Sequence, residues 1–147
     1  MPKFYAVNGV PDTMEGRFGV IAVHMYLVLD RIRQQGTDGD EVARALLETF
    51  MTDMDDNMRE IGIGDVGVPR RVKKAAAALH EQVEAYTSAM AASDDTALKL
   101  ALTTYIMLGD GRHDVSGLAH YVRSVAASLI PQLWSEIGAG RITFPTV

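Results

Sequence analysis

The chain has 147 residues, the length of one ordinary domain, and no cysteine, which excludes disulfides, thiolate metal sites and a cysteine nucleophile. Its net charge of -5 at pH 7 argues against nonspecific binding to nucleic acid, and we also predict no specific DNA binding. The charge is uneven, because residues 37–65 contain nine acidic residues and only two basic ones. We therefore expect one domain, residues 1–147, with a strongly acidic segment in an otherwise slightly basic chain.

The first predicted helix spans about residues 13–35. Asp12 and Glu15 have the spacing of a capping box at its start, and Gly36 follows its polar end. The apolar run 18–29 is shorter than the roughly 20 residues that a membrane span needs and contains His24, so it is typical of a buried core helix.

Two further helices are expected on either side of a glycine-rich loop. The first spans residues 40–62, because apolar residues recur there at intervals of four, four, four and three: Leu46, Phe50, Met54, Met58 and Ile61. The second begins at Pro69, which suits a first helical turn. Its apolar stripe predicts the side that faces the core: Val72, Ala76, Leu79, Val83, Tyr86 and Met90.

The last two predicted helices complete the fold. Ser93 or Asp94 can cap a fourth helix, whose apolar residues are Leu98, Ala101, Leu102, Tyr105 and Ile106. A fifth should span residues 116–137, bent near its middle by Pro131. No segment alternates strictly enough to predict a strand, and the tail 141–147 is too short to form a sheet alone. The sequence predicts an all-α, compact single-domain bundle of about five main helices.

The acidic segment first suggests a calcium loop. Asp53, Asp55 and Asn57 match its first, third and fifth ligand positions. Met58 and Gly64 then stand where the loop needs glycine and glutamate, so the calcium interpretation fails. Asp55 also lies four residues before Arg59, a spacing that predicts an ion pair on the helix surface.

A carboxylate metal site is the second possibility for this segment. Asp53, Asp56 and Glu60 share one helix face within about 60° of each other. No second helix with a Glu-x-x-His motif faces them, so a solvated or ion-paired face is the simpler interpretation.

The histidines and glycines predict no chemistry. His24 is best interpreted as a core histidine with satisfied nitrogens, and His113 as a turn residue, while His80 and His120 lie on different helices. The glycines of residues 62–67 lack the preceding strand of a phosphate-binding loop. We predict no catalytic residue, metal ligand or cofactor.

The basic cluster Arg70, Arg71, Lys73 and Lys74 lies opposite the predicted core stripe, so these side chains should be exposed. Cations near a helix N-terminus interact unfavourably with the helix dipole, at a cost of about 0.3 to 1 kcal/mol each. Carboxylates near the C-terminus of the preceding helix carry a similar cost. Two explanations stay open. The two clusters can offset each other across an antiparallel hairpin, or they can form an exposed surface that recognises a partner.

The same residues carry a family resemblance. Segments 4–33 and 50–76, with GVPDTMEGRF and DMDDNMREIGIGDVGVP, resemble the ubiquinol-cytochrome c chaperone family, and LAHYVRS at 118–124 is a weaker match. The resemblance implies an all-helical, non-enzymatic factor that engages newly made cytochrome b during assembly of respiratory complex III. By analogy it singles out Gly9, Pro11, Asp12, Thr13, Glu15, Gly16, Arg17, Asp53, Asp55, Asp56, Arg59, Glu60, Gly62, Gly64, Asp65, Val68 and Pro69.

The chain departs from the family pattern at two internal places. Residues 79–82 are LHEQ where members tend to have FYGR, and an expected Arg-Asn pair is missing around Thr103 and Thr104. Relatives also have an earlier helix before the GVPDT segment. These departures leave the role of a divergent member open.

The preferred hypothesis is a chaperone on the cytoplasmic or mitochondrial-matrix side that holds an apolar client, since the N-terminus lacks signal-peptide and transit-peptide patterns. A charged rim would flank an apolar groove lined by methionines such as Met54, Met58 or Met107. The residues expected to bind client or partner are Asp53, Asp55, Asp56, Arg59, Glu60, Asp65, Arg70, Arg71, Lys73 and Lys74.

The expected partner is cytochrome b or another complex III precursor, with the ribosome or a membrane surface as further candidates. Two rival functions remain. The basic helix start could bind anionic lipid headgroups at a membrane surface, or the bundle could hold a small ligand.

Overall fold

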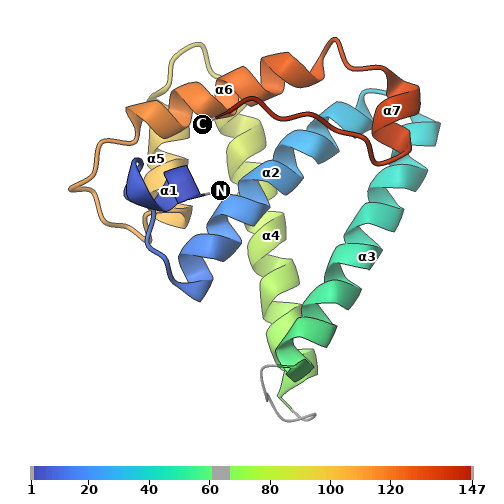
Figure 1. Ribbon diagram of the computed structural model, residues 1–147, viewed down its shortest axis with the longest axis horizontal. Coiled ribbons are helices and arrows are strands. Elements are labelled where there is room, and N and C mark those ends of the chain that lie inside the picture. The colour runs from blue at the N-terminus through green and yellow to red at the C-terminus, as the bar shows by residue number, and fades with distance from the viewer. Residues whose placement is uncertain (1, 61–66, 147) are drawn as a thin grey trace.

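Helix α2 lies at the centre of the computed structural model and contacts α3, α4 and α6 (Figure 1). The structure describes residues 2–60 and 67–146, with side chains from residue 4 onward. Within these residues all regular secondary structure is helical, which confirms the predicted all-α class. The helices are α1 Pro2–Ala6, α2 Met14–Arg33, α3 Thr37–Glu60, α4 Val68–Ala91, α5 Thr96–Tyr105, α6 Ser116–Leu129 and α7 Trp134–Gly138.

Thr13 caps the start of α2, so the predicted cap at Asp12 is wrong by one residue. Thr13 has extended backbone, and its Oγ1 accepts a hydrogen bond from the Gly16 amide at 3.1 Å. Asp12 instead accepts from Arg17 Nε at 2.7 Å. The helix ends at Arg33, and Gly36 turns the chain with a φ of +67°.

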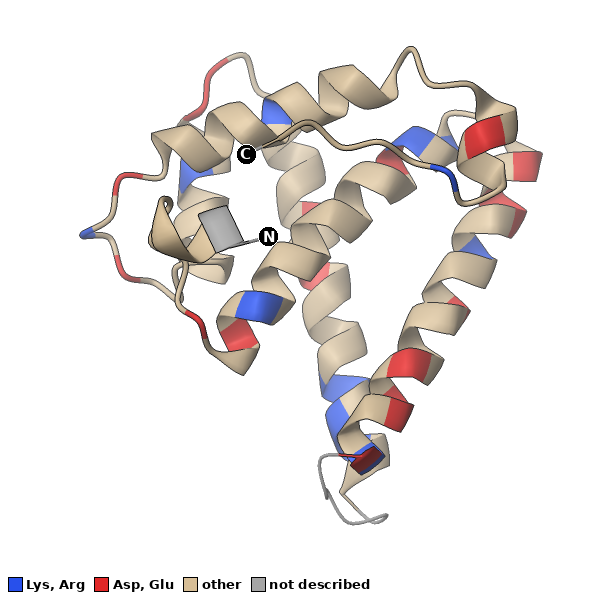
Figure 2. Cartoon of the chain, in the orientation of Figure 1, with Lys and Arg blue, Asp and Glu red and all other residues tan. Residues whose placement is uncertain are grey.

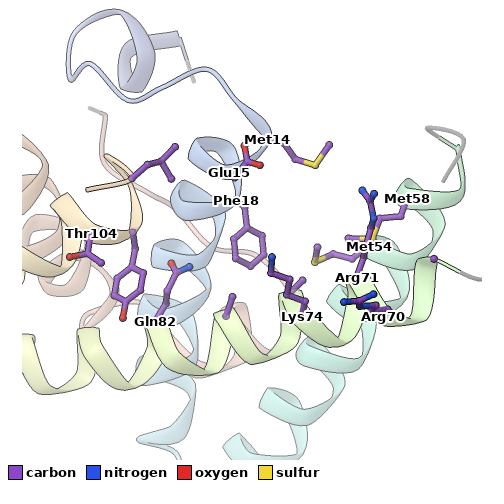
Figure 3. A pocket seen from close by; sticks show the side chains of 15 residues that line it. Met14, Glu15, Phe18, Met54, Met58, Arg70, Arg71, Lys74, Gln82 and Thr104 are labelled. Atoms are coloured by element: carbon purple, nitrogen blue, oxygen red, sulfur yellow. The ribbon is translucent and has the colours of Figure 1, made fainter. Parts of the chain in front are cut away.

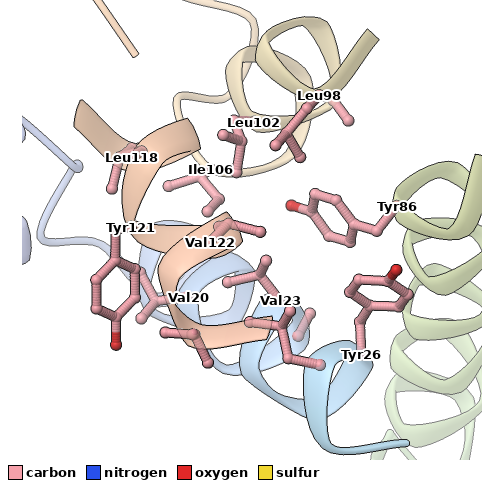
Figure 4. Close-up of a cluster of buried hydrophobic side chains, with 14 of the residues drawn as sticks. Val20, Val23, Tyr26, Tyr86, Leu98, Leu102, Ile106, Leu118, Tyr121 and Val122 are labelled. Atoms are coloured by element: carbon pink, nitrogen blue, oxygen red, sulfur yellow. The ribbon is translucent and has the colours of Figure 1, made fainter. Parts of the chain in front are cut away.

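The core lies between α2, α4, α5 and α6 (Figure 4). Val23 and Tyr26 of α2 meet Tyr86 of α4, Leu102 of α5 and Val122 of α6, all buried. The predicted stripe of the third helix is confirmed at its second half, where Leu79, Val83 and Tyr86 are buried, while Val72, Ala76 and Met90 are only half-buried.

Pro131 ends a helix where the sequence predicted a bend. Helix α6 stops at Leu129 and the separate helix α7 begins at Trp134, because proline has no N–H to continue the ladder. Arg31 of α2 donates from Nε to the Leu129 carbonyl and from Nη2 to the Gln132 carbonyl, each at 3.1 Å. These two hydrogen bonds hold the end of α6 against α2.

The sequence did not predict the short helix α1, which covers one end of the core. Phe4 is buried and packs edge-on against the rings of His24 and Tyr121, 5.7 and 5.2 Å away. Both His24 nitrogens have partners, with Nδ1 2.7 Å from the Val20 carbonyl and Nε2 2.9 Å from the Tyr121 hydroxyl. The prediction of a satisfied core histidine is confirmed.

Helix α3 is less buried than its apolar period predicted. Only Gly39 and Ala43 are buried in its 24 residues. The predicted core residues Leu46, Phe50, Met54 and Met58 are half-buried, and Ile61 lies outside the described residues. The cause is the position of the helix. Helix α3 starts beside the end of α2 and finishes beside the start of α4, and its middle lies away from both helices (Figure 1).

Candidate functional site

An open groove of about 800 Å³ lies between α2, α3, α4 and the end of α5 (Figure 3). Helix α4 forms its floor, α2 and α3 form two walls, and the chain after α5 closes one end. The lining is mainly apolar. Its described residues are Met14, Glu15, Phe18, Met54, Met58, Gly67, Arg70, Arg71, Lys74, Ala75, Ala78, Gln82, Thr104, Tyr105 and Leu108.

Three methionines give the groove an adaptable apolar surface. Met54 and Met58 of α3 line it, as we expected, and Met14 of α2 adds a side chain that is 62% exposed. Met107 does not contribute, because it is 1% exposed and packs in the core, so that part of the expectation is wrong. Flexible thioether side chains can adjust to clients of different shape.

A basic rim borders one end of the groove. Arg70, Arg71 and Lys74 line it and are exposed at the start of α4, whereas Lys73 is exposed and does not line it. In the described part of the chain, none of these four cations forms an ion pair with a carboxylate. Their charge is therefore available to a molecule in the groove.

The predicted acidic residues lie beside the groove. Asp53, Asp56 and Glu60 are exposed on α3, and Asp55 pairs with Arg59 Nε at 2.6 Å, which confirms the predicted surface pair. None of these residues lines the groove, and Asp65 lies outside the described residues. Residues 2–60 and 67–146 contain no cluster of three His, Asp or Glu side chains that could hold a metal ion.

The acidic and basic clusters lie at the same end of a helical hairpin. Figure 2 shows the acidic residues of late α3, in red, and the basic residues of early α4, in blue, where the two helices meet. The hairpin that we considered is present, but the described cations of α4 are not joined to the α3 carboxylates by ion pairs. The fold is therefore compatible with both explanations for placing cations at the start of one helix and carboxylates at the end of the other: mutual offset across the hairpin, or a surface that recognises a partner.

Gln82 places an unpartnered amide at the groove floor. The residue is 5% exposed, and its Oε1 is buried without a hydrogen-bond partner. In Figure 3 its side chain rises from α4 between Phe18 and the α5 side of the groove. An unsatisfied buried polar group costs about 1 to 3 kcal/mol. The sequence analysis did not single out Gln82 as a functional residue. Its position three residues after Leu79 and directly before Val83, both on the core stripe, could have indicated a buried polar side chain.

Leu108 forms the edge of the groove beyond α5. The sequence analysis did not predict a role for this residue either. Its φ of 56° lies in the left-handed region, and the side chain is 48% exposed. This backbone costs a non-glycine residue about 1 to 2 kcal/mol. The Gly109 amide, bonded to the Thr103 carbonyl at 2.9 Å, holds the turn in place.

Tyr105 supplies a hydroxyl near the same end of the groove. Burial and a hydrogen bond from its hydroxyl to Glu81 raise the pKa of Tyr105, so the phenol stays neutral at physiological pH. The groove thus has cations at one end, an apolar middle, and neutral polar groups at the other.

Comparisons with known proteins agree with the resemblance. A family model described as ubiquinol-cytochrome C chaperone matches residues 7–144. A Xenopus laevis protein named ubiquinol-cytochrome-c reductase complex assembly factor 1 is 24% identical over 100 residues, which are 68% of this chain. The match covers 50% of that protein, so the chain spans about half the length of this curated relative. The crystal structure of the Cbp3 homolog from Brucella abortus matches with a TM-score of 0.85 and 33% identity, over 99% of this chain and 81% of that one.

Proposed function

Because the chain belongs to the ubiquinol-cytochrome c chaperone family, we propose that it is a non-enzymatic assembly factor of ubiquinol-cytochrome c reductase, respiratory complex III. The Xenopus relative is named as an assembly factor of that complex. The client is newly made cytochrome b. We place the binding event at the face of the membrane where this client is inserted, on the bacterial cytoplasmic or the mitochondrial-matrix side.

The groove is the observation that supports this function best. Its apolar middle, formed by Phe18, Met54 and Met58, suits an apolar segment that still lacks its final partners. Arg70 and Arg71, which have no carboxylate partner among residues 2–60 and 67–146, attract a client of complementary charge and speed its encounter. Holding a client in this way requires binding and no reacting group.

The first test compares two charge-reversed variants in the cell that makes the protein. Arg70→Glu/Arg71→Glu should reduce the cytochrome b that copurifies with the tagged chain, because it reverses the rim. The reduction should be roughly tenfold, which corresponds to about 1.4 kcal/mol. Quantitative mass spectrometry of gently solubilised membranes measures the recovered cytochrome b.

The matched control is Arg33→Glu/Arg44→Glu, which reverses two exposed cations that do not line the groove. It should recover cytochrome b at the wild-type level, and circular dichroism should show equal helix content in both variants. Cells that lack the protein should also contain less assembled complex III. Normal amounts of the complex in those cells would overturn the proposed function.

A further inference from the structure

Helix α4 has a second packing face that turns toward the groove. Arg71, Ala75, Ala78 and Gln82 follow one another at spacings of four, three and four, and all line the groove. The core-facing residues Leu79, Val83 and Tyr86 lie on another side of the helix. Spacing of this kind produces the stripe along which one helix packs against another. No described helix occupies this face between its two ends, where the groove is open.

The middle of this face is formed by small residues. Ala75 and Ala78 project only a methyl group, so a helix lying in the groove could approach α4 closely. The methionines of α3 and Phe18 of α2 would then flank it on both sides (Figure 3). From Arg71 to Gln82 the floor extends roughly 16 Å, at a rise of 1.5 Å per residue, which equals about three helical turns.

A molecule bound in the groove must present different chemical groups to the two ends of the floor. At one end Arg70, Arg71 and Lys74 have no carboxylate partner among the described residues. At the other end the buried Oε1 of Gln82 has no hydrogen-bond partner among the described residues. A lipid acyl chain would leave that oxygen without a partner, whereas a polypeptide can supply both a carboxylate and a hydrogen-bonding side chain.

We propose that the groove binds one helical client segment of about three turns. The segment packs its apolar face on Ala75 and Ala78, places carboxylates beside Arg70 and Arg71, and forms a hydrogen bond with Gln82. This inference rests on the proposed function, because the client supplies the helix. Beyond that function, the inference specifies that the client is helical, that it carries negative charge, and which of its ends lies beside the cations.

Synthetic helical peptides test the charge requirement. The probe is a three-turn leucine-rich peptide with two glutamates at one end and one asparagine at the other, and its counterpart has lysines in place of the glutamates. Fluorescence anisotropy with the full chain should give an affinity at least about tenfold higher for the glutamate peptide. Equal affinities would overturn the proposed charge polarity.

Two neighbouring alanines test the packing face. Ala78→Met fills the groove and should weaken peptide binding at least about tenfold, while Ala77→Met, at an exposed position that does not line the groove, should leave it unchanged. Equal effects of the two substitutions would place the peptide elsewhere. Circular dichroism checks that both variants are folded.

Gln82→Leu tests the polar end independently of the alanines. The variant should lose affinity for the asparagine peptide and not for a peptide with leucine at that place, so the two changes should be coupled in a double-mutant cycle. Additive effects would exclude the hydrogen bond. Because the substitution removes a buried amide oxygen that has no partner among the described residues, it should not destabilise the fold.

A vesicle experiment separates a peptide from a lipid surface. Phosphatidylserine vesicles that displace the glutamate peptide, and whose binding Ala78→Met abolishes, would assign the groove to lipid and overturn the inference. Failure of all peptides to bind, with complex III still lost in cells lacking the protein, would reject this inference and leave the proposed function standing. Normal complex III in those cells would reject both.

Discussion

His24 is a half-buried titratable side chain that joins four parts of the fold. Its ring contacts Phe4 of α1, Tyr121 of α6 and Phe144 of the C-terminal tail, at centroid distances of 5.3 to 5.7 Å. With Nδ1 donating to the Val20 carbonyl, Nε2 accepts from the Tyr121 hydroxyl. Burial lowers the pKa of His24, so the folded protein holds the neutral imidazole.

This arrangement predicts a loss of stability in mild acid. The unfolded imidazole has a pKa of about 6.5 and binds a proton that the folded ring resists, so the free energy of unfolding should fall as pH drops below that value. Between pH 7.5 and 5.5, wild type should lose up to about 1 kcal/mol more than His24→Leu. Urea denaturation at both pH values measures the difference.

The exposed histidines His80, His113 and His120 are present in both proteins, so their contributions cancel in this comparison. An equal loss of stability in wild type and His24→Leu would show that His24 titrates as freely in the folded state as in the unfolded one.

Single residues differ in how far their sequence neighbours predict their role. The apolar residues around His24 correctly predicted a histidine with satisfied nitrogens, because both its helix and its first hydrogen-bond partner are local. The unpartnered Oε1 of Gln82 was not predictable in this way. Its isolation depends on which side chains α2 and α5 bring to the groove, and these lie far away in the sequence.

Arg31 shows how one helix fixes the end of another. It donates to the Leu129 carbonyl at the C-terminal end of α6 and to the Gln132 carbonyl just beyond that end. Arg31→Gln should lower the free energy of unfolding by about 1 to 3 kcal/mol, because two part-buried carbonyls lose a charged donor. Urea denaturation measures the change.

The control for this element is Arg33→Gln, two residues further along α2 and exposed. It removes a cation from the same last turn of α2, so the effect of the helix dipole is matched. Equal destabilisation by the two substitutions would mean that the contact with α6 contributes nothing.

The helices themselves were largely predictable, and their ends less so. The apolar periods located α2 to α6, because such periods reflect one buried face. Pro131 was expected to bend a long helix, but the tertiary structure uses it to end α6, with Gln132 then bonded to Thr143 of the tail. The partners of that turn are Thr143, which is eleven residues away, and Arg31 of α2, so the local apolar pattern did not decide between a bend and an end.

At the scale of the whole molecule, burial is concentrated away from α3. Helices α2 and α6 each contribute many buried residues, whereas α3 contributes Gly39 and Ala43 alone. No helix in the described residues combines the length and apolarity of a membrane span. Of the half-buried apolar residues of α3, Leu46 and Phe50 pack against the edge of the core, while Met54 and Met58 line the groove. Local stability should therefore be uneven.

Hydrogen exchange should reveal this unevenness. Amides of residues 44–60 in α3 should exchange faster than those of residues 19–32 in α2, because fewer buried contacts oppose local opening of α3. Residue-resolved exchange measured by NMR gives both rates under the same conditions. Equal protection of the two helices would show that the groove wall is as stable as the core.

The sequence by itself determined the helical class, the approximate places of the main helices, the exposure of the basic cluster and the family. These depend on local period, helix propensity and a specific motif, all of which lie in contiguous residues. Only the tertiary structure decided that Met54 and Met58 face a groove while Met107 is buried, and that Gln82 lies at the groove floor with its Oε1 unpartnered among the described residues. The physical reason is that a groove is the space between helices, and its size and lining depend on how α2, α3 and α4 cross.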